Sequence, residues 1–227
     1  MATVLKLSAL WEAANMVLPT KDEWIKALTE RHGKELQQAF SSATVAICGL
    51  GGLGSNIAIA LARAGVGRLI LIDFDRVDIT NLHRQQYKAE QIGMYKTVAL
   101  AKNLKEIAPY ISLEIHTERI TEDNVLTLLT DADIICEAFD DAECKAMLTE
   151  IVLTEMRDKY LVAASGLAGL YDANHIKTRK VTSKFYLCGD EKSDVADGIG
   201  LVSSRVMICA AHQAHTVLRI LANNFEE

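Results

Sequence analysis

The sequence predicts an α/β protein with a mostly parallel sheet, helices on both faces of that sheet, and a helical N-terminal extension. Three observations lead to this fold class. Short apolar runs alternate with helical segments, a glycine-rich turn separates the first run from the helix after it, and only Pro19 and Pro109 interrupt the chain. We therefore expect a single domain over residues 1–227, with the extension at 1–42 and the α/β core at 43–222.

The composition is that of a globular protein with a sizeable core. Of the 227 residues, 50% are hydrophobic and 24% are charged, which excludes disorder as a description of the whole chain. The formal net charge of −6 and the lack of a Lys/Arg block argue against binding to nucleic acid. The five cysteines are scattered without a C-x-x-C pair, so we expect a reducing cytoplasm, no disulfide framework and no structural zinc.

Two segments could be mistaken for targeting or membrane signals. Met1–Thr20 contains Lys6 and Glu12 and lacks the features of a signal peptide, so we expect it to be retained as a short amphipathic helix. Residues 41–62 are uncharged and long enough to span a bilayer, but four glycines stand in their middle. These glycines indicate a turn between two elements, so we expect no membrane partner.

The elements of the extension and of the first βαβ unit can be assigned from local signals. Thr20-Lys-Asp-Glu23 has the form of a capping box and predicts a helix to about Arg31, followed by Gly33. The pattern then changes to a βαβ unit. This unit comprises strand Thr44–Cys48, the glycine turn, helix Ser55–Ala64 and strand Arg68–Ile72.

The rest of the chain continues the alternation, which implies parallel strands joined by right-handed crossovers. The expected elements are helix Lys96–Ile107, strand Ser112–His116, a short helix near Glu122–Leu129, strand Asp133–Ala138, helix Ala142–Lys159 and strand Tyr160–Ser165. A polar strand-like stretch at His175–Cys188 and a long apolar helix at Val202–Leu221 complete the chain.

The glycine turn predicts a nucleotide site. Gly49-Leu-Gly51-Gly-Leu-Gly54 matches G-x-G-x-x-G between a strand and a helix, the context in which backbone N–H groups and a helix N-terminus can approach phosphate. Asp73 ends the second strand, where a carboxylate can accept both ribose hydroxyls. Together they indicate a Rossmann-like nucleotide-binding core. The plainer alternative is a glycine turn with Asp73 as a strand-end cap.

Charge distinguishes a triphosphate from a dinucleotide, because ATP brings roughly four negative charges that Mg²⁺ and cationic side chains must offset. Asn81-Leu-His-Arg84-Gln85 follows the second strand, Lys96 begins a helix, and Asp140 stands at the carboxyl edge of the sheet. This set suits ATP. Individually, Lys96 can also be a solvated lysine, and Asp140 or its neighbour Asp141 can simply cap the next helix.

At these residues the sequence resembles the ubiquitin-activating-enzyme-like superfamily and, within it, the ThiF/MoeB/HesA family, most nearly its short-form ThiF members. The resemblance covers roughly residues 24–221. The motifs that carry it are the glycine turn, Leu-Ile-Asp73-Phe-Asp75, Asn81-Leu-His-Arg84-Gln85, Gly93-Met-Tyr-Lys96, Ala-Phe-Asp140-Asp, Ile-Lys177-Thr-Arg179-Lys180 and Phe-Tyr-Leu-Cys188-Gly-Asp190.

The resemblance implies an ATP-dependent adenylyltransferase acting on a ubiquitin-like sulfur carrier protein of thiamine biosynthesis. The C-terminal glycine carboxylate of the carrier, which ends in Gly-Gly, would become an acyl adenylate with release of pyrophosphate. The implied roles are the phosphate turn for Gly49, Gly51 and Gly54, the ribose for Asp73, the phosphates for Asn81, Arg84, Gln85 and Lys96, and Mg²⁺ for Asp140.

The resemblance also implies partners. Relatives are homodimers in which an N-terminal arginine reaches the ATP of the other subunit, and Arg31 is the nearest match here. No rhodanese-like extension follows the last helix, so we expect a separate sulfur donor protein. Some relatives form a covalent link to the carrier through a cysteine. Cys188, which we expect in a loop, is the candidate for that link, although an inert structural thiol is the favoured interpretation.

Two weaker patterns and three alternative functions stay open. Cys209, His212 and His215 resemble a metal triple, but their helical spacing favours packing. Lys177, Arg179 and Lys180 either steer an acidic carrier or form a solvated basic strand. The alternative functions are a dehydratase acting on a tRNA threonylcarbamoyladenosine, a nicotinamide-dependent oxidoreductase, and a non-catalytic adaptor that binds a ubiquitin-like partner.

Overall fold

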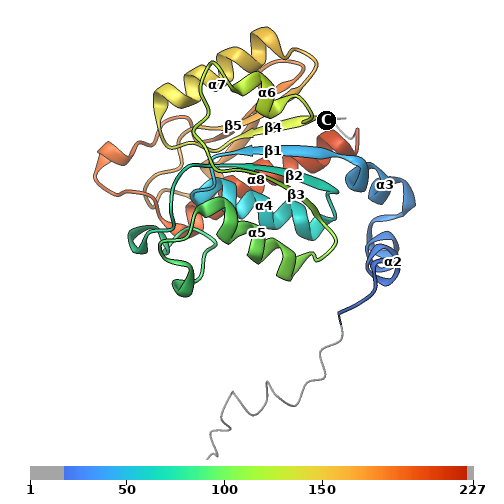
Figure 1. The fold of residues 1–227 in the computed structure, drawn as a ribbon. Coiled ribbons are helices and arrows are strands. Elements are labelled where there is room, and N and C mark those ends of the chain that lie inside the picture. The colour runs from blue at the N-terminus through green and yellow to red at the C-terminus, as the bar shows by residue number, and fades with distance from the viewer. Residues whose placement is uncertain (1–17, 224–227) are drawn as a thin grey trace, which may run out of the picture.

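The computed structural model describes residues 18–223, which form a seven-stranded sheet with helices on both faces (Figure 1). The strand order is β3-β2-β1-β4-β5-β7-β6, and every neighbouring pair is parallel except the antiparallel pair β6 and β7. The strands are β1 (Thr44–Cys48), β2 (Arg68–Ile72), β3 (Ser112–His116), β4 (Ile134–Glu137), β5 (Tyr160–Ala164), β6 (Lys177–Lys180) and β7 (Phe185–Gly189). The predicted Rossmann-like fold is confirmed.

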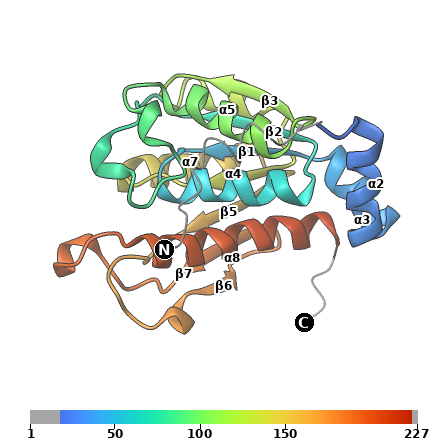
Figure 2. The ribbon, with the colours of Figure 1, turned by 90° about the horizontal axis from the view of Figure 1, so that it is seen from below.

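The helices form a layer on each face of the sheet. One face is covered by α4 (Gly52–Ala64), α5 (Lys96–Ile107) and α8 (Ser203–Leu221), as Figure 2 shows from below. The opposite face is covered by α6 (Val125–Leu129) and α7 (Ala142–Glu155).

Alternation along the strands divides the core between these two layers. Val45 and Ile47 of β1 belong to the hydrophobic cluster beneath α4, whereas Ala46 and Cys48 belong to the cluster on the other face. Successive side chains of a strand point to opposite faces. Because both faces are buried, the central strands are almost continuously apolar.

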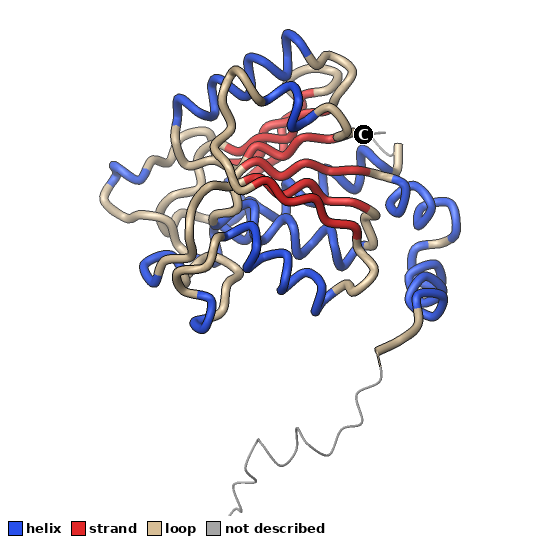
Figure 3. Tube along the Cα trace, viewed as in Figure 1, coloured by secondary structure: helices blue, strands red, loops and turns tan. Residues whose placement is uncertain are grey.

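Two helices precede the sheet and lie at its amino edge, as Figure 3 shows. α2 (Lys21–His32) begins with the predicted capping box, in which Thr20 and Glu23 bond each other's backbone N–H groups. Gly33, with φ of +85°, separates it from α3 (Lys34–Ser42), which leads directly into β1. The amphipathic helix predicted within Met1–Thr20 falls almost wholly outside the described residues.

Some of the predicted element boundaries agree with the structure and others differ from it. β1, β2, β3 and α5 have the predicted bounds. α4 begins at Gly52 rather than Ser55, because Gly51 already occupies the N-cap. α7 ends at Glu155 rather than Lys159, since Met156 leaves helical geometry and accepts a hydrogen bond from the Lys159 N–H.

The polar stretch at His175–Cys188 contains two strands rather than one. β6 and β7 pair antiparallel, with Lys177 opposite Gly189 and Lys180 opposite Tyr186. β6 is the edge strand of the sheet and all four of its residues are exposed, which explains the polar character of its sequence. Within residues 18–223, no helix combines the length and apolarity needed to cross a membrane.

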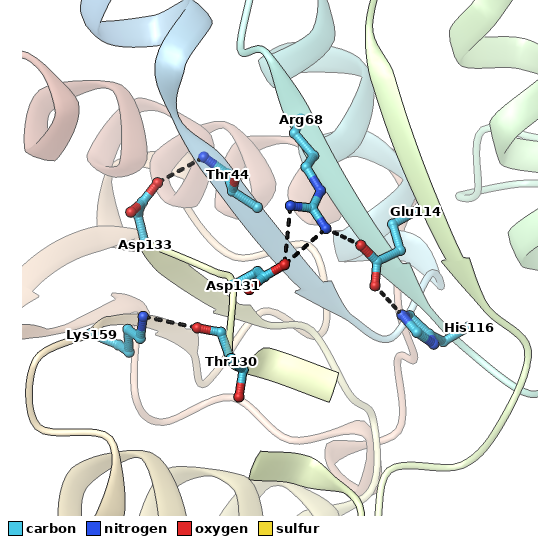
Figure 4. A network of polar contacts seen from close by, with 8 residues as sticks. All are labelled: Thr44, Arg68, Glu114, His116, Thr130, Asp131, Asp133 and Lys159. Atoms are coloured by element: carbon cyan, nitrogen blue, oxygen red, sulfur yellow. Dashed lines mark hydrogen bonds and ion pairs between the residues drawn. The ribbon is translucent and has the colours of Figure 1, made fainter. Parts of the chain in front are cut away.

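A network of charged side chains joins β2, β3 and the loop before β4 (Figure 4). Arg68 at the start of β2 donates to Glu114 of β3 and, at 3.2 Å, to Asp131. His116 Nε2 lies 2.6 Å from Glu114 Oε1. The Arg68 hydrogen bond, followed by that of His116, lowers the pKa of the Glu114 carboxyl.

Arg68→Met is expected to lower the free energy of unfolding by about 0.5 kcal/mol at neutral pH, because the pair is partly solvated. A carboxyl with a lowered folded pKa contributes stability above its unfolded pKa and loses it as the pH falls through the folded value. The difference from wild type should therefore shrink below about pH 4. Urea unfolding at neutral and acid pH measures it, and Lys26→Met, which breaks an exposed pair with Glu30 at 4.0 Å, is the control. A difference that stays constant with pH would contradict the assignment.

Candidate functional site

A cavity of about 520 Å³ opens at the carboxyl ends of the central strands. The chain builds β1, β2 and β3 outward in one direction and then crosses to β4 on the other side of β1. Ligands of open α/β sheets bind in the crevice at such a switch point. The cavity is lined by the glycine turn and by most of the residues predicted from the sequence, namely Gly49, Gly51, Asp73, Asn81, Arg84, Gln85, Lys96 and Asp140.

The glycine turn is shaped by close backbone contacts. Gly49 has φ of +92°, and a Cβ there would lie 2.8 Å from the Ala138 carbonyl oxygen. A Cβ on Gly54 would lie only 1.8 Å from the Gly49 carbonyl oxygen. Gly51 is the N-cap of α4, and no side chain caps this helix. The first N–H groups of α4 are therefore available to an anion at the cavity.

Asp73 stands at the end of β2, is 8% exposed, and accepts one backbone hydrogen bond at each oxygen. Leu50 N–H donates to Oδ2 and Asp75 N–H donates to Oδ1, both at 2.7 Å. Burial raises the pKa of Asp73, while Lys96 and these two N–H groups oppose the rise. Each carboxylate oxygen keeps a second lone pair, so the group can still accept from a ribose hydroxyl.

Lys96 is not the solvated lysine of the plainer interpretation. It begins α5, is 6% exposed, and lines the cavity. Its Nζ donates to Asp75 Oδ2 at 2.7 Å and lies 4.0 Å from Asp73 Oδ2. A buried ammonium beside two carboxylates is held at a defined place on the cavity wall.

The loop after β2 contributes the other predicted phosphate ligands. Asn81 ends a short 3₁₀ turn, and its carbonyl accepts from the N–H groups of Arg84 and Gln85. Four buried side-chain atoms among the described residues have no hydrogen-bond partner, and two of them, Arg84 Nε and Gln85 Oε1, belong to residues that line the cavity. An unpaired buried polar group costs about 1–3 kcal/mol. Groups left in this state beside a cavity are suited to a polar ligand.

The two adjacent aspartates after β4 have different roles. Asp141 caps α7, since the Cys144 N–H donates to its Oδ1 at 2.8 Å. Asp140 is exposed to the cavity and makes no hydrogen bond or ion pair within residues 18–223. Mg²⁺ is commonly held by one or two carboxylates together with water and substrate phosphates. Asp140 supplies one such carboxylate at the cavity, where water and phosphate oxygens would have to provide the other ligands. Within the described part of the chain, no group of three His, Cys, Asp or Glu side chains could hold a metal by itself.

The structure corrects the predicted place of Cys188. It lies in strand β7 rather than a loop, is fully buried, and has its Sγ 3.5 Å from Thr178 Oγ1. Burial raises the pKa of this thiol, which makes it a poor nucleophile. The interpretation of Cys188 as a structural thiol is supported.

The residues of the other weak patterns also lie away from the cavity, either packed in the core or exposed. Cys209 is buried under β7, and His212 Nδ1 lies 3.0 Å from Thr178 Oγ1, so these residues pack rather than form a metal site. Arg179 on the exposed strand β6 forms an ion pair with Glu191 at 2.7 Å. Arg31 lies on α2 at the amino edge of the sheet and does not line the cavity. Its action in a partner subunit stays a prediction.

Sequence reasoning missed several residues of the cavity wall. Phe74 and Arg119 stack on each other with the guanidinium carbon 4.2 Å from the ring centre. Lys145 also lines the cavity, and it forms an ion pair at 2.9 Å with the buried Glu137. The sequence held a signal for Glu137 alone, because this residue is the single charge in the otherwise apolar run at residues 134–139.

Comparison with known sequences identifies similar proteins. The profile of the ThiF family matches residues 26–227. "Adenylyltransferase and sulfurtransferase MOCS3" of Dictyostelium discoideum is 28% identical over 212 residues, covering 87% of this chain and 49% of that protein. "Sulfur carrier protein adenylyltransferase" of Thermus thermophilus is 34% identical over 119 residues, covering 52% of this chain and 44% of that protein. The chain spans less than half the length of these relatives.

Solved structures show the same fold. The E. coli tRNA N6-threonylcarbamoyladenosine dehydratase TcdA in complex with ATP superposes with a TM-score of 0.80 at 22% identity, covering 91% of this chain and 98% of that one. E. coli MccB with ATP superposes with a TM-score of 0.68 at 20% identity, covering 96% and 75%. At these identities the likeness is one of fold.

Proposed function

This chain belongs to the ThiF family, and from that premise we propose that it is an ATP-dependent adenylyltransferase. Its substrate would be the C-terminal glycine carboxylate of a ubiquitin-like sulfur carrier protein, of the kind used in thiamine biosynthesis. The observation that carries the proposal is the convergence of four side chains on one cavity. Arg84 and Gln85 have unpaired buried atoms, Lys96 is buried, and the Asp140 carboxylate has no partner within residues 18–223.

This set of groups suits a triphosphate better than a nicotinamide dinucleotide. A pyrophosphate bridge needs the glycine turn and the N-terminus of α4, which a dinucleotide site would also use. Such a site would not use the cationic Arg84 and Lys96 or the carboxylate of Asp140. A triphosphate with a divalent ion uses all three, because its larger negative charge has to be offset.

The chemistry proposed for this site is an in-line displacement. A carboxylate oxygen of the carrier attacks the α-phosphorus of ATP, an oxygen–phosphorus bond forms, and the bond to the bridging oxygen of the β-phosphate breaks. Pyrophosphate departs with the electron pair. An α-carboxyl has a pKa of about 3.3–3.7, so the nucleophile is already ionised and no general base is required.

The residues of the cavity would therefore act by alignment and by stabilising charge. Gly49, Gly51 and the first turn of α4 would bind phosphate oxygens, and Asp73 would orient the ribose. Arg84 and Lys96 would offset the charge that develops on the leaving pyrophosphate. Mg²⁺, when bound through Asp140, would supply further positive charge there.

Assembly and sulfur transfer complete the proposal. We infer a homodimer in which Arg31 of one subunit reaches the ATP of the other, and a separate protein that donates sulfur to the activated carrier. The relatives named as both adenylyltransferase and sulfurtransferase support a link between adenylation and sulfur chemistry. A cytoplasmic location is part of the same proposal.

ATP–pyrophosphate exchange in the presence of candidate carriers ending in Gly-Gly tests the proposal. We expect exchange that depends on the carrier, and mass spectrometry should detect the carrier with an added AMP. A carrier lacking its last glycine is the matched control, because it removes only the acceptor carboxylate position.

The other outcomes of this experiment identify the alternative functions. Dehydration of threonylcarbamoyladenosine in tRNA, with no carrier adenylate, would assign the chain to the dehydratase class. Carrier binding without exchange would indicate an adaptor. Calorimetry that detects NADH but no ATP in the presence of Mg²⁺ would overturn the adenylyltransferase proposal.

A further inference from the structure

Lys145 lines the cavity, and its ammonium group already contacts two other groups of the protein. It lies in the first turn of α7, and its Nζ is 2.9 Å from both Glu137 Oε1 and Glu137 Oε2. The third contact, at 3.1 Å, is to the carbonyl oxygen of Ala164 at the end of β5. The Glu137 carboxylate and the Ala164 carbonyl hold the ammonium group in place. Lys145 therefore ties together the ends of β4 and β5 and the start of α7.

Glu137 is the buried partner that extends this connection into the next turn. It is the last residue of β4, and its side chain is 2% exposed. Besides the Lys145 ammonium, its Oε1 accepts the Phe139 N–H at 2.8 Å. Its backbone carbonyl accepts from Gln213 Nε2 of α8 at 2.9 Å. Burying a carboxylate costs several kcal/mol unless it is paired, so this pairing constrains where the strand ends.

Asp140 lies between two restrained positions. On one side, the Phe139 N–H is held by Glu137, and on the other, Asp141 caps α7. The same turn packs against the glycine turn, since a Cβ on Gly49 would meet the Ala138 carbonyl oxygen at 2.8 Å. The Glu137–Lys145 pair is thus connected, through the Phe139 N–H, to the turn that carries Asp140.

We propose that Glu137 and Lys145 are positioning residues that place the Asp140 carboxylate opposite the glycine turn, and so set the affinity for magnesium in the nucleotide complex. This inference rests on the proposed ATP site. It concerns the metal-dependent part of nucleotide binding rather than nucleotide binding as a whole. Partners in the outer shell of a metal ligand act in this way, and their loss typically weakens metal affinity about 10–100-fold.

The test is calorimetric titration of the full chain with ATP, with a range of Mg²⁺ concentrations and with EDTA. For Lys145→Met we expect ATP affinity in EDTA close to wild type and a Mg²⁺ half-saturation raised about tenfold. Lys145→Arg should restore much of the loss, because a guanidinium can also pair with both oxygens of Glu137. Lys159→Met is the matched control, since Lys159 lies at the opposite end of β5 and donates to the Thr130 carbonyl oxygen.

Lys145→Met leaves Glu137 buried without its partner, which can unfold the chain. The double variant Glu137→Met/Lys145→Met removes both charges, and we expect it to fold and to show the same rise in Mg²⁺ half-saturation. Unchanged Mg²⁺ half-saturation in a folded variant would overturn the proposal. So would an equal loss of ATP affinity with and without Mg²⁺, which would mean that Lys145 binds phosphate directly.

The failure of the proposed function would look different in these experiments. If the wild-type chain binds ATP with Mg²⁺ but no carrier supports pyrophosphate exchange, the adenylyltransferase proposal fails while the positioning role is still measured. If the wild-type chain shows no Mg²⁺ dependence of ATP binding, the positioning role is overturned as well.

Discussion

Asp140→Ala is expected to lower ATP–pyrophosphate exchange at least about 100-fold, a loss typical of removing one group that stabilises developing charge. The carboxylate lies on the cavity wall and makes no contact within residues 18–223 that the fold needs. We therefore expect the free energy of unfolding to change by less than about 0.5 kcal/mol. Exchange assays and urea unfolding of the same preparation measure both effects.

Asp141→Asn is the matched control for this prediction. The neighbouring carboxylate caps α7 through the Cys144 N–H, and asparagine is an equally good N-cap residue. The variant removes one negative charge at almost the same place but leaves Asp140 intact, so most of the exchange should remain. Unchanged exchange in Asp140→Ala would remove this residue from the mechanism.

Gly54→Ala is expected to destabilise the chain by about 3 kcal/mol, in the upper range for overpacked sites. Its Cβ would lie 1.8 Å from the Gly49 carbonyl oxygen and 3.1 Å from Ile47 Cγ2. The first contact is with backbone, so a side-chain rotation cannot relieve it, and the glycine turn must move away from α4. Urea unfolding monitored by circular dichroism gives the loss in stability, and calorimetry gives the accompanying loss of ATP binding.

Gly51→Ala separates the structural and the binding roles of the turn. A Cβ at this position would meet only Gln85 Nε2, at 3.7 Å, which is an ordinary contact. The cost in stability should be about 1 kcal/mol or less, the difference between glycine and alanine at an N-cap. ATP binding should still weaken, because the methyl group would lie beside Gln85 in the cavity where we propose that the phosphates bind. Equal destabilisation by the two substitutions would contradict this description of the turn.

Periodic and local patterns were sufficient to predict most of the fold. The apolar runs of β1 and β2 and the capping box at Thr20 each depend on residues close in sequence, and their bounds agree with the structure. The G-x-G-x-x-G pattern has its physical cause within a few residues, where Gly54 must leave room for the Gly49 carbonyl. Such features can be predicted from sequence because the interactions that produce them are short-range.

The order of the strands and the roles of neighbouring polar residues could be determined only from the tertiary structure. Asp140 and Asp141 are equivalent as helix caps in sequence, and only the folded chain shows that Asp141 accepts the Cys144 N–H while Asp140 has no partner within residues 18–223. Cys188 precedes Gly189-Asp190, which predicted a loop, but the pairing of β7 with β5 places it in the core. Lys145 meets Glu137 and Ala164 because β4 and β5 are adjacent and α7 starts between them. These contacts are set by long-range packing, which cannot be predicted from the spacing of the residues along the chain.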